Sequence, residues 1–209
     1  QRDARRILQH RKKFGVACLI TNRLEMKLGN AYTMTTEPPS GNRQDELAHV
    51  RHKPPTALVL PRELVLVCAP LRSNINLSNM VRTAGCCGIT RLVACGHVKI
   101  DKNIARDGAD QVEIEVHRTL PPVLRQLKQE GFTLVGLEQT TDSKNIHEFQ
   151  FPRKTALVLG NERLGLTDEE LRLVDVCVEI PVWGMPHAYN VATSAAMALY
   201  EYCRQYPEG

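Results

Sequence analysis

The feature that most constrains the fold is an alternation of short apolar runs with amphipathic stretches, which begins near residue 63. The runs read LVLVCA, RLVACG, VEIEV, FTLVGLE, TALVLG and VCVEIPV. Short apolar runs that end in turn residues are typical of buried strands, and the stretches between them are typical of helices. This order predicts an α/β fold with a mostly parallel sheet and helices on both faces.

The first part of the chain differs from the rest in charge and composition. Residues 1–13 are rich in arginine and lysine, and residues 34–56 are polar and contain several prolines. We predict a basic helical extension with a polar loop over residues 1–56, and a single α/β domain over residues 57–209. A basic cluster can follow RNA phosphates, or it can be a solvated helix face. The candidate RNA-binding residues here are Arg2, Arg5, Arg6, Lys12 and Lys13.

Several classes of protein do not fit this sequence. No window approaches the roughly 18 apolar residues of a membrane span, and no signal peptide precedes the domain. We therefore expect a protein of the cytoplasm or the nucleus that does not contact membranes. The seven histidines and seven cysteines lack metal-ligand spacing, so no metal site is predicted. The sequence starts with Gln1 and not with methionine, and we expect further domains in a longer polypeptide.

A glycine-rich stretch, LVLGNERLGLT, follows one of the predicted strands at residues 157–167. Gly160 and Gly165 have the spacing of a nucleotide-binding P-loop. Leu166 stands where that loop requires a lysine, and Glu162 adds a negative charge. The substitution argues against a phosphate-transferring P-loop enzyme. A glycine loop after a parallel strand still predicts a ligand at the carboxyl end of that strand.

Two further stretches carry unusual polar groups. In NINLSNMVRTAGCCGI, residues 74–89, Asn76, Asn79 and Arg82 are spaced by three and can share a helix face. That face is either a functional site or a combination of a helix cap and a surface ion pair. The stretch IPVWGMPHAYNVATSAAMALYEY, residues 180–202, is a bent loop that enters a helix of small residues. Such a helix packs closely, either within the domain or across a dimer.

Together the three stretches resemble the three motifs of the SpoU/TrmH family of SPOUT RNA 2′-O-ribose methyltransferases, over about residues 63–205. The nearest likeness is to the C-terminal domain of very long eukaryotic tRNA guanosine 2′-O-methyltransferases. The resemblance implies S-adenosylmethionine as cofactor and tRNA as substrate, with guanosine 18 of the D-loop as the target. It also implies a C-terminal trefoil knot, an exception to the rule that chains are not threaded.

The resemblance implies a role for individual residues of the motifs. The expected cofactor contacts are Leu137, Glu138, Gly160, Ile180 and Tyr189, with Gly160 letting the backbone approach the ligand. The expected catalytic residues are Arg82, Asn76, Glu162 and Asn190. Because the pKa of a guanidinium exceeds about 12, we expect Arg82 to clamp a phosphate and polarise the 2′-hydroxyl, while the other three orient it. Arg204 is either an RNA-binding arginine or a solvated helix-end cation.

The third motif departs from the family pattern, because Ala188 and Tyr189 replace the usual serine and leucine, and Ala192 replaces a further serine. The resemblance also implies a homodimer. A stripe of mostly small residues on the last helix can form its interface or pack inside one chain. The stripe consists of Val191, Ala195, Ala198 and Tyr202. Two alternative functions stay open: an RNA-binding scaffold without turnover, and a 2′-O-methyltransferase for another RNA.

Overall fold

The computed structural model describes residue 50 and residues 53–209. Residues 54–209 form one compact unit. Almost all of the predicted N-terminal extension, with its candidate RNA-binding residues, lies outside the described part of the chain.

All strands of the described part belong to one sheet, in the order β3-β2-β1-β6-β4-β7-β5, and every neighbouring pair is parallel. The strands are β1 (Leu64–Cys68), β2 (Arg91–Cys95), β3 (Glu113–His117), β4 (Thr133–Leu137), β5 (Lys144–Asn145), β6 (Thr155–Leu159) and β7 (Val176–Glu179). Each predicted apolar run forms a strand, so the predicted parallel sheet is confirmed. The short edge strand β5 was not predicted.

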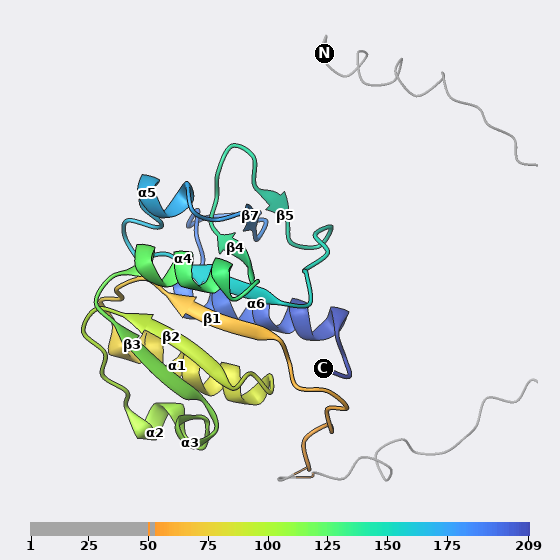
Figure 1. Ribbon diagram of the computed structural model, residues 1–209. Coiled ribbons are helices and arrows are strands. Elements are labelled where there is room, and N and C mark those ends of the chain that lie inside the picture. Colours follow the sequence, from red (N-terminus) through yellow and green to blue (C-terminus); the bar gives the residue numbers. More distant parts are fainter. Residues whose placement is uncertain (1–49, 51–52) are drawn as a thin grey trace, which may run out of the picture. The chain divides into compact units, whose positions relative to one another are not determined.

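Helices cover both faces of this sheet, as predicted (Figure 1). They are α1 (Asn74–Cys86), α2 (Lys102–Ala105), α3 (Gly108–Gln111), α4 (Leu120–Gln129), α5 (Asp168–Leu171) and α6 (Val191–Gln205). Side chains alternate between the two faces of a strand. Leu66 of β1 therefore packs in the core with α1 and α6, whereas Val67 packs in the core with α4.

The small-residue stripe of α6 packs inside the chain. Ala195, Ala198 and Tyr202 are fully buried, in the same core that α1 contributes to. The Tyr202 hydroxyl also donates a hydrogen bond to the backbone oxygen of Arg153 (2.5 Å). Of the two alternatives, packing inside the chain therefore holds for Ala195, Ala198 and Tyr202, whereas Val191 is half-buried. The homodimer itself stays a prediction.

Two further expectations concern membrane-spanning helices and the trefoil knot. No helix in the described part is long and apolar enough to cross a membrane. The threading of the C-terminal segment into a trefoil knot stays a prediction.

Candidate active site

A cavity of about 250 Å³ lies at the carboxyl ends of three adjacent strands. Its walls include Leu137 at the end of β4, Leu159 at the end of β6 and Glu179 at the end of β7. Parallel α/β sheets bind their ligands at this edge. The structure brings together all of the residues that were expected to contact a cofactor. They are Leu137, Glu138, Gly160, Ile180 and Tyr189.

The glycine loop after β6 closes on itself beside this cavity. Asn161 and Gly165 exchange backbone hydrogen bonds of 3.0 and 2.9 Å. A Cβ atom added at Gly160 would lie 2.6 Å from the backbone nitrogen of Leu166. The loop therefore requires glycine at position 160 for its own closure, a reason that the sequence did not reveal.

The end of β4 holds the glycine loop in place. The Glu138 carboxylate accepts a hydrogen bond from the backbone N–H of Leu166 (3.0 Å). The Leu166 side chain is buried in the core on the α4 side of the sheet. The residue at the lysine position of a P-loop thus points into the core, which excludes a P-loop arrangement here.

Three of the four expected catalytic residues form one hydrogen-bonded chain. The Asn190 amide donates to Oδ1 of Asn76 (3.2 Å), and the Asn76 amide donates to Oε1 of Glu162 (3.1 Å). Asn190 also caps α6, because its side-chain oxygen accepts from the backbone N–H groups of Ala192 (2.9 Å) and Thr193 (3.4 Å). These contacts fix the orientation of both amides at the rim of the cavity.

Glu162 connects the glycine loop to the start of α1. Its carboxylate accepts hydrogen bonds from the backbone N–H groups of Arg72 (2.8 Å) and Ser73 (3.0 Å). Ser73 is the N-cap of α1, a role that neither Asn74 nor Asn76 takes. Partial burial alone would raise the pKa of Glu162, but these hydrogen bonds and the one from Asn76 outweigh it and hold the pKa below its ordinary value of 4.5.

The lowered pKa predicts a pH-dependent contribution of Glu162 to stability. Ionised Glu162 stabilises the fold above the pKa of the unfolded chain, and this contribution is lost as the pH falls through the lower, folded-state pKa. Glu162→Gln should therefore lower the free energy of unfolding at pH 7, and the difference from the wild type should shrink only below about pH 4.5, as the pH falls toward 3. Urea unfolding of both proteins across this range measures it. A difference that stays constant with pH would contradict the assignment.

Arg82 lies apart from this chain of polar groups. It is exposed on α1, and among the described residues its side chain has no hydrogen bond or ion pair. Six residues separate it from Asn76, which is about 9 Å along a helix and about 120° around it. Within residues 53–209 no hydrogen bond joins Arg82 to Asn76, Glu162 or Asn190, and the expectation that these three residues orient Arg82 stays a prediction.

Arg204 lies in the last turn of α6 and pairs with Glu201, at 2.7 and 2.9 Å. An exposed pair of this kind contributes little to stability. RNA binding by Arg204 stays a prediction.

Sequence reasoning missed residues that line or brace the cavity. Arg163 and Ser194 line it, and the Asn161 amide donates to the backbone oxygen of Pro70 (2.7 Å). Their only sequence signal was their position inside the motifs. Within residues 53–209, no group of three or more histidine, cysteine or acidic residues is placed to hold a metal ion.

The charges around the cavity suit a cationic ligand. Three carboxylates line it, from Glu138, Glu162 and Glu179, against the single guanidinium of Arg163. A triphosphate would be repelled by this lining, whereas a ligand with a positive charge is favoured. Leu137, Ile180 and other apolar side chains provide the surface for a flat apolar group.

Residues 63–200 match the model of the SpoU rRNA Methylase family. The chain is 33% identical over 152 residues to the tRNA (guanosine(18)-2′-O)-methyltransferase TARBP1 of Mus musculus, and 29% identical over 133 residues to the tRNA (guanosine(18)-2′-O)-methyltransferase of Escherichia coli K12. These matches cover 68% and 62% of this chain. They span only 9% of the mouse relative and 58% of the bacterial one.

Solved structures with the SpoU and TrmH names are also similar to this chain. The crystal structure of the A. aeolicus TrmH/SpoU tRNA modifying enzyme is similar, with a TM-score of 0.66 and 28% identity over 70% of this chain and 77% of that one. The SpoU methyltransferase AviRb of Streptomyces viridochromogenes, in complex with the cofactor AdoMet, has a TM-score of 0.60 and 26% identity, over 70% of this chain and 61% of that one.

Proposed function

The chain belongs to the SpoU rRNA Methylase family, and from this premise we propose that it is an S-adenosylmethionine-dependent tRNA 2′-O-ribose methyltransferase. We propose guanosine 18 of the D-loop as its target, in line with the names of its relatives. The observation that carries the proposal is the shared position of Glu162. This residue lines the cavity of the expected cofactor contacts and also ends the hydrogen-bonded chain of expected catalytic residues.

The cavity lining fits the proposed cofactor. S-adenosylmethionine supplies an activated methyl group on a positively charged sulfur. Leu137, Ile180 and Tyr189 offer apolar surface to an adenine ring, and the carboxylates of Glu138 and Glu179 favour a positive charge. The glycine loop keeps this wall rigid, because it closes on its own backbone.

The remaining task of the protein is to position a ribose hydroxyl, since correct placement alone supplies much of the rate of such reactions. Asn76 and Asn190 are held by each other and by Glu162, so their amides are preorganised. Arg82 is open to solvent and has no protein partner in residues 53–209, so its guanidinium is free to hold a phosphate and polarise the 2′-hydroxyl. Because a guanidinium has five N–H donors and no acceptor, this role of Arg82 is electrostatic and is not that of a base.

Two measurements separate an enzyme from an RNA-binding scaffold. Calorimetry measures whether the protein binds S-adenosylmethionine, and a labelled methyl group reports transfer to an unmodified tRNA transcript. We expect both binding and transfer. Binding of cofactor and tRNA without transfer would establish the scaffold, and transfer to another RNA but not to tRNA would overturn the proposed substrate.

We also propose a homodimer, through the outward side of the layer formed by α1 and α6 (Figure 1). The α6 part of this side carries two large exposed apolar residues, Met197 and Tyr200, which is 74% exposed. A two-fold interface between copies of this surface would cover them.

Tyr200→Glu should therefore lower the molecular mass in light scattering from that of a dimer to that of a monomer. The melting temperature of the monomeric unit should change little, because the side chain contributes little to the core. Gln129→Glu on the exposed side of α4 adds the same charge on the other face of the sheet and serves as the control. A wild type that is monomeric at micromolar concentration would refute the dimer.

A further inference from the structure

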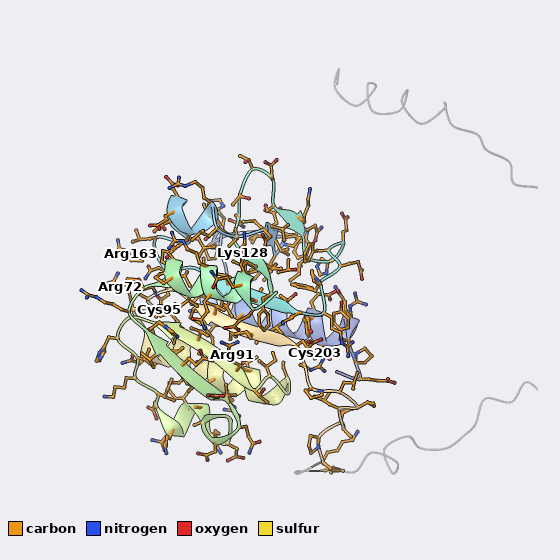
Figure 2. All side chains as sticks on the ribbon, in the orientation of Figure 1. Arg72, Arg91, Cys95, Lys128, Arg163 and Cys203 are labelled. Carbon is orange, nitrogen blue, oxygen red and sulfur yellow. The ribbon has the colours of Figure 1, made fainter. Side chains whose placement is uncertain are left out.

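Two arginines flank Glu162 at the rim of the cavity. Arg72 precedes the N-cap of α1, and Arg163 directly follows Glu162. Two hydrogen bonds hold the glycine loop against the segment before α1. Glu162 accepts one from the backbone N–H of Arg72 (2.8 Å), and the Asn161 amide donates one to the backbone oxygen of Pro70 (2.7 Å). Figure 2 shows both arginines at the edge of the molecule toward which β1 points. The fold thus holds two guanidinium groups in one region.

The positive charges of Arg72 and Arg163 are not compensated within residues 53–209. Neither guanidinium has a hydrogen bond or an ion pair there, although both residues adjoin Glu162, Arg72 through its backbone N–H and Arg163 in sequence. The oxygens of Glu162 are already occupied by N–H groups from the start of α1. Arg91, by contrast, is held by Glu115 (2.5 Å) and Glu130 (2.7 Å). Exposed arginines without partners are suited to bind phosphate oxygens.

A large aromatic side chain is exposed on the loop that joins β7 to α6. Trp183 is 82% exposed, which is unusual for a residue type that is mostly buried. Its neighbours Val182 and Gly184 line a second hollow of about 420 Å³. This hollow adjoins the main cavity, since Glu179, Ile180 and Val182 line both. The loop that carries Trp183 therefore borders the proposed active site.

Free guanidinium groups and an exposed indole beside one cavity suit single-stranded RNA. Unpaired bases stack on aromatic rings, and arginines follow the backbone phosphates. We propose that Arg72 and Arg163 bind phosphates next to the target nucleotide and that Trp183 stacks on a nearby unpaired base. This inference rests on the proposed function, because it takes the RNA substrate as the occupant of the rim. A second copy of the chain is the competing occupant.

The chain contains a single tryptophan, so fluorescence excited at a wavelength that tyrosine does not absorb reports on Trp183 alone. Titration of the full chain with an unmodified tRNA transcript should quench this emission to saturation, and an RNA duplex without unpaired bases should not. Trp183→Ala should weaken tRNA binding, measured by fluorescence anisotropy of labelled tRNA, about tenfold. Trp183→Phe should retain most of the affinity, since it keeps an aromatic face. Both variants should fold, because the side chain is exposed.

The arginines are tested by the salt dependence of the same binding. Arg72→Gln and Arg163→Gln should each reduce the slope of log affinity against log salt concentration by about one, the effect of one lost phosphate contact. Lys102→Gln is the control, because it removes one exposed positive charge on α2, which Figure 1 shows well away from the end of β1. Its slope should equal that of the wild type.

Unchanged tRNA affinity in Trp183→Ala, or unchanged salt slopes in both arginine variants, would overturn the proposal that these residues bind RNA. Loss of dimer mass in Trp183→Ala would also overturn it, because Trp183 would then belong to a subunit interface. These binding measurements do not need methyl transfer. If the wild type methylates tRNA and the variants bind tRNA normally, only the proposed RNA contacts of Arg72, Arg163 and Trp183 are refuted. If the variants lose affinity but the wild type transfers no methyl group, only the proposed reaction is refuted.

Discussion

Replacement of Arg82 by alanine should lower the rate of methyl transfer by a factor on the order of 10² to 10³, the usual cost of removing one hydrogen-bond donor that stabilises the transition state. The fold and the affinity for S-adenosylmethionine should be almost unchanged. Arg82 is exposed, has no hydrogen bond or ion pair within residues 53–209, and does not line the cavity. Single-turnover kinetics with tRNA, calorimetry with the cofactor and thermal unfolding measure the three effects separately.

Arg82→Lys distinguishes a planar guanidinium from a simple positive charge. It should recover only part of the lost rate, because a lysine cannot hold a phosphate and a hydroxyl in the same forked geometry. Full activity in Arg82→Ala, or an unfolded variant, would contradict the role assigned to this residue.

Gly160→Ala should disrupt the cavity and abolish most of the cofactor binding. Even a methyl group at this position would lie 2.6 Å from the backbone nitrogen of Leu166, so the glycine loop must open. Overpacking of this kind costs about 1–3 kcal/mol, which corresponds to a roughly five- to hundredfold loss of affinity if the strain falls on the binding conformation. Gly160→Val should lower the cofactor affinity further, because the branched side chain of valine is larger than a methyl group.

Gly184→Ala is the matched control for this substitution. Gly184 lies on the neighbouring loop, and a methyl group there would contact nothing within 4 Å. Its cofactor affinity, measured by the same calorimetric titration, should equal that of the wild type. Equal affinities in the two alanine variants would show that closure of the glycine loop does not shape the binding site.

The sheet was predictable because its strands are short, apolar and separated by turn residues. β5 escaped detection since Lys144 and Asn145 are polar and form only a two-residue edge strand beside β7. The order of strands was not predictable from local patterns, because β6 inserts between β1 and β4 through contacts that are distant in sequence. The burial of the α6 stripe likewise depends on tertiary packing, and small residues alone did not distinguish an internal from an external contact.

The members of the candidate site could be predicted from the motifs, but their contacts could not. The amides of Asn76 and Asn190 meet because the start of α1 and the start of α6 lie side by side, a relation that no spacing encodes. Glu162 was expected to help orient Arg82 and the nucleotide, and its contacts to the backbone before α1 could not be predicted from the motifs.

The most direct test of the central claim is the position of the transferred methyl group. Wild-type protein, S-adenosylmethionine and an unmodified tRNA transcript are incubated, and the product is mapped by nuclease digestion and mass spectrometry. A parallel transcript carries 2′-deoxyguanosine at the target and is otherwise identical. The account predicts one 2′-O-methylguanosine, at guanosine 18 of the D-loop, and no product with the deoxy transcript. Methylation of a base, methylation at another nucleotide, or equal methylation of the deoxy transcript would contradict it.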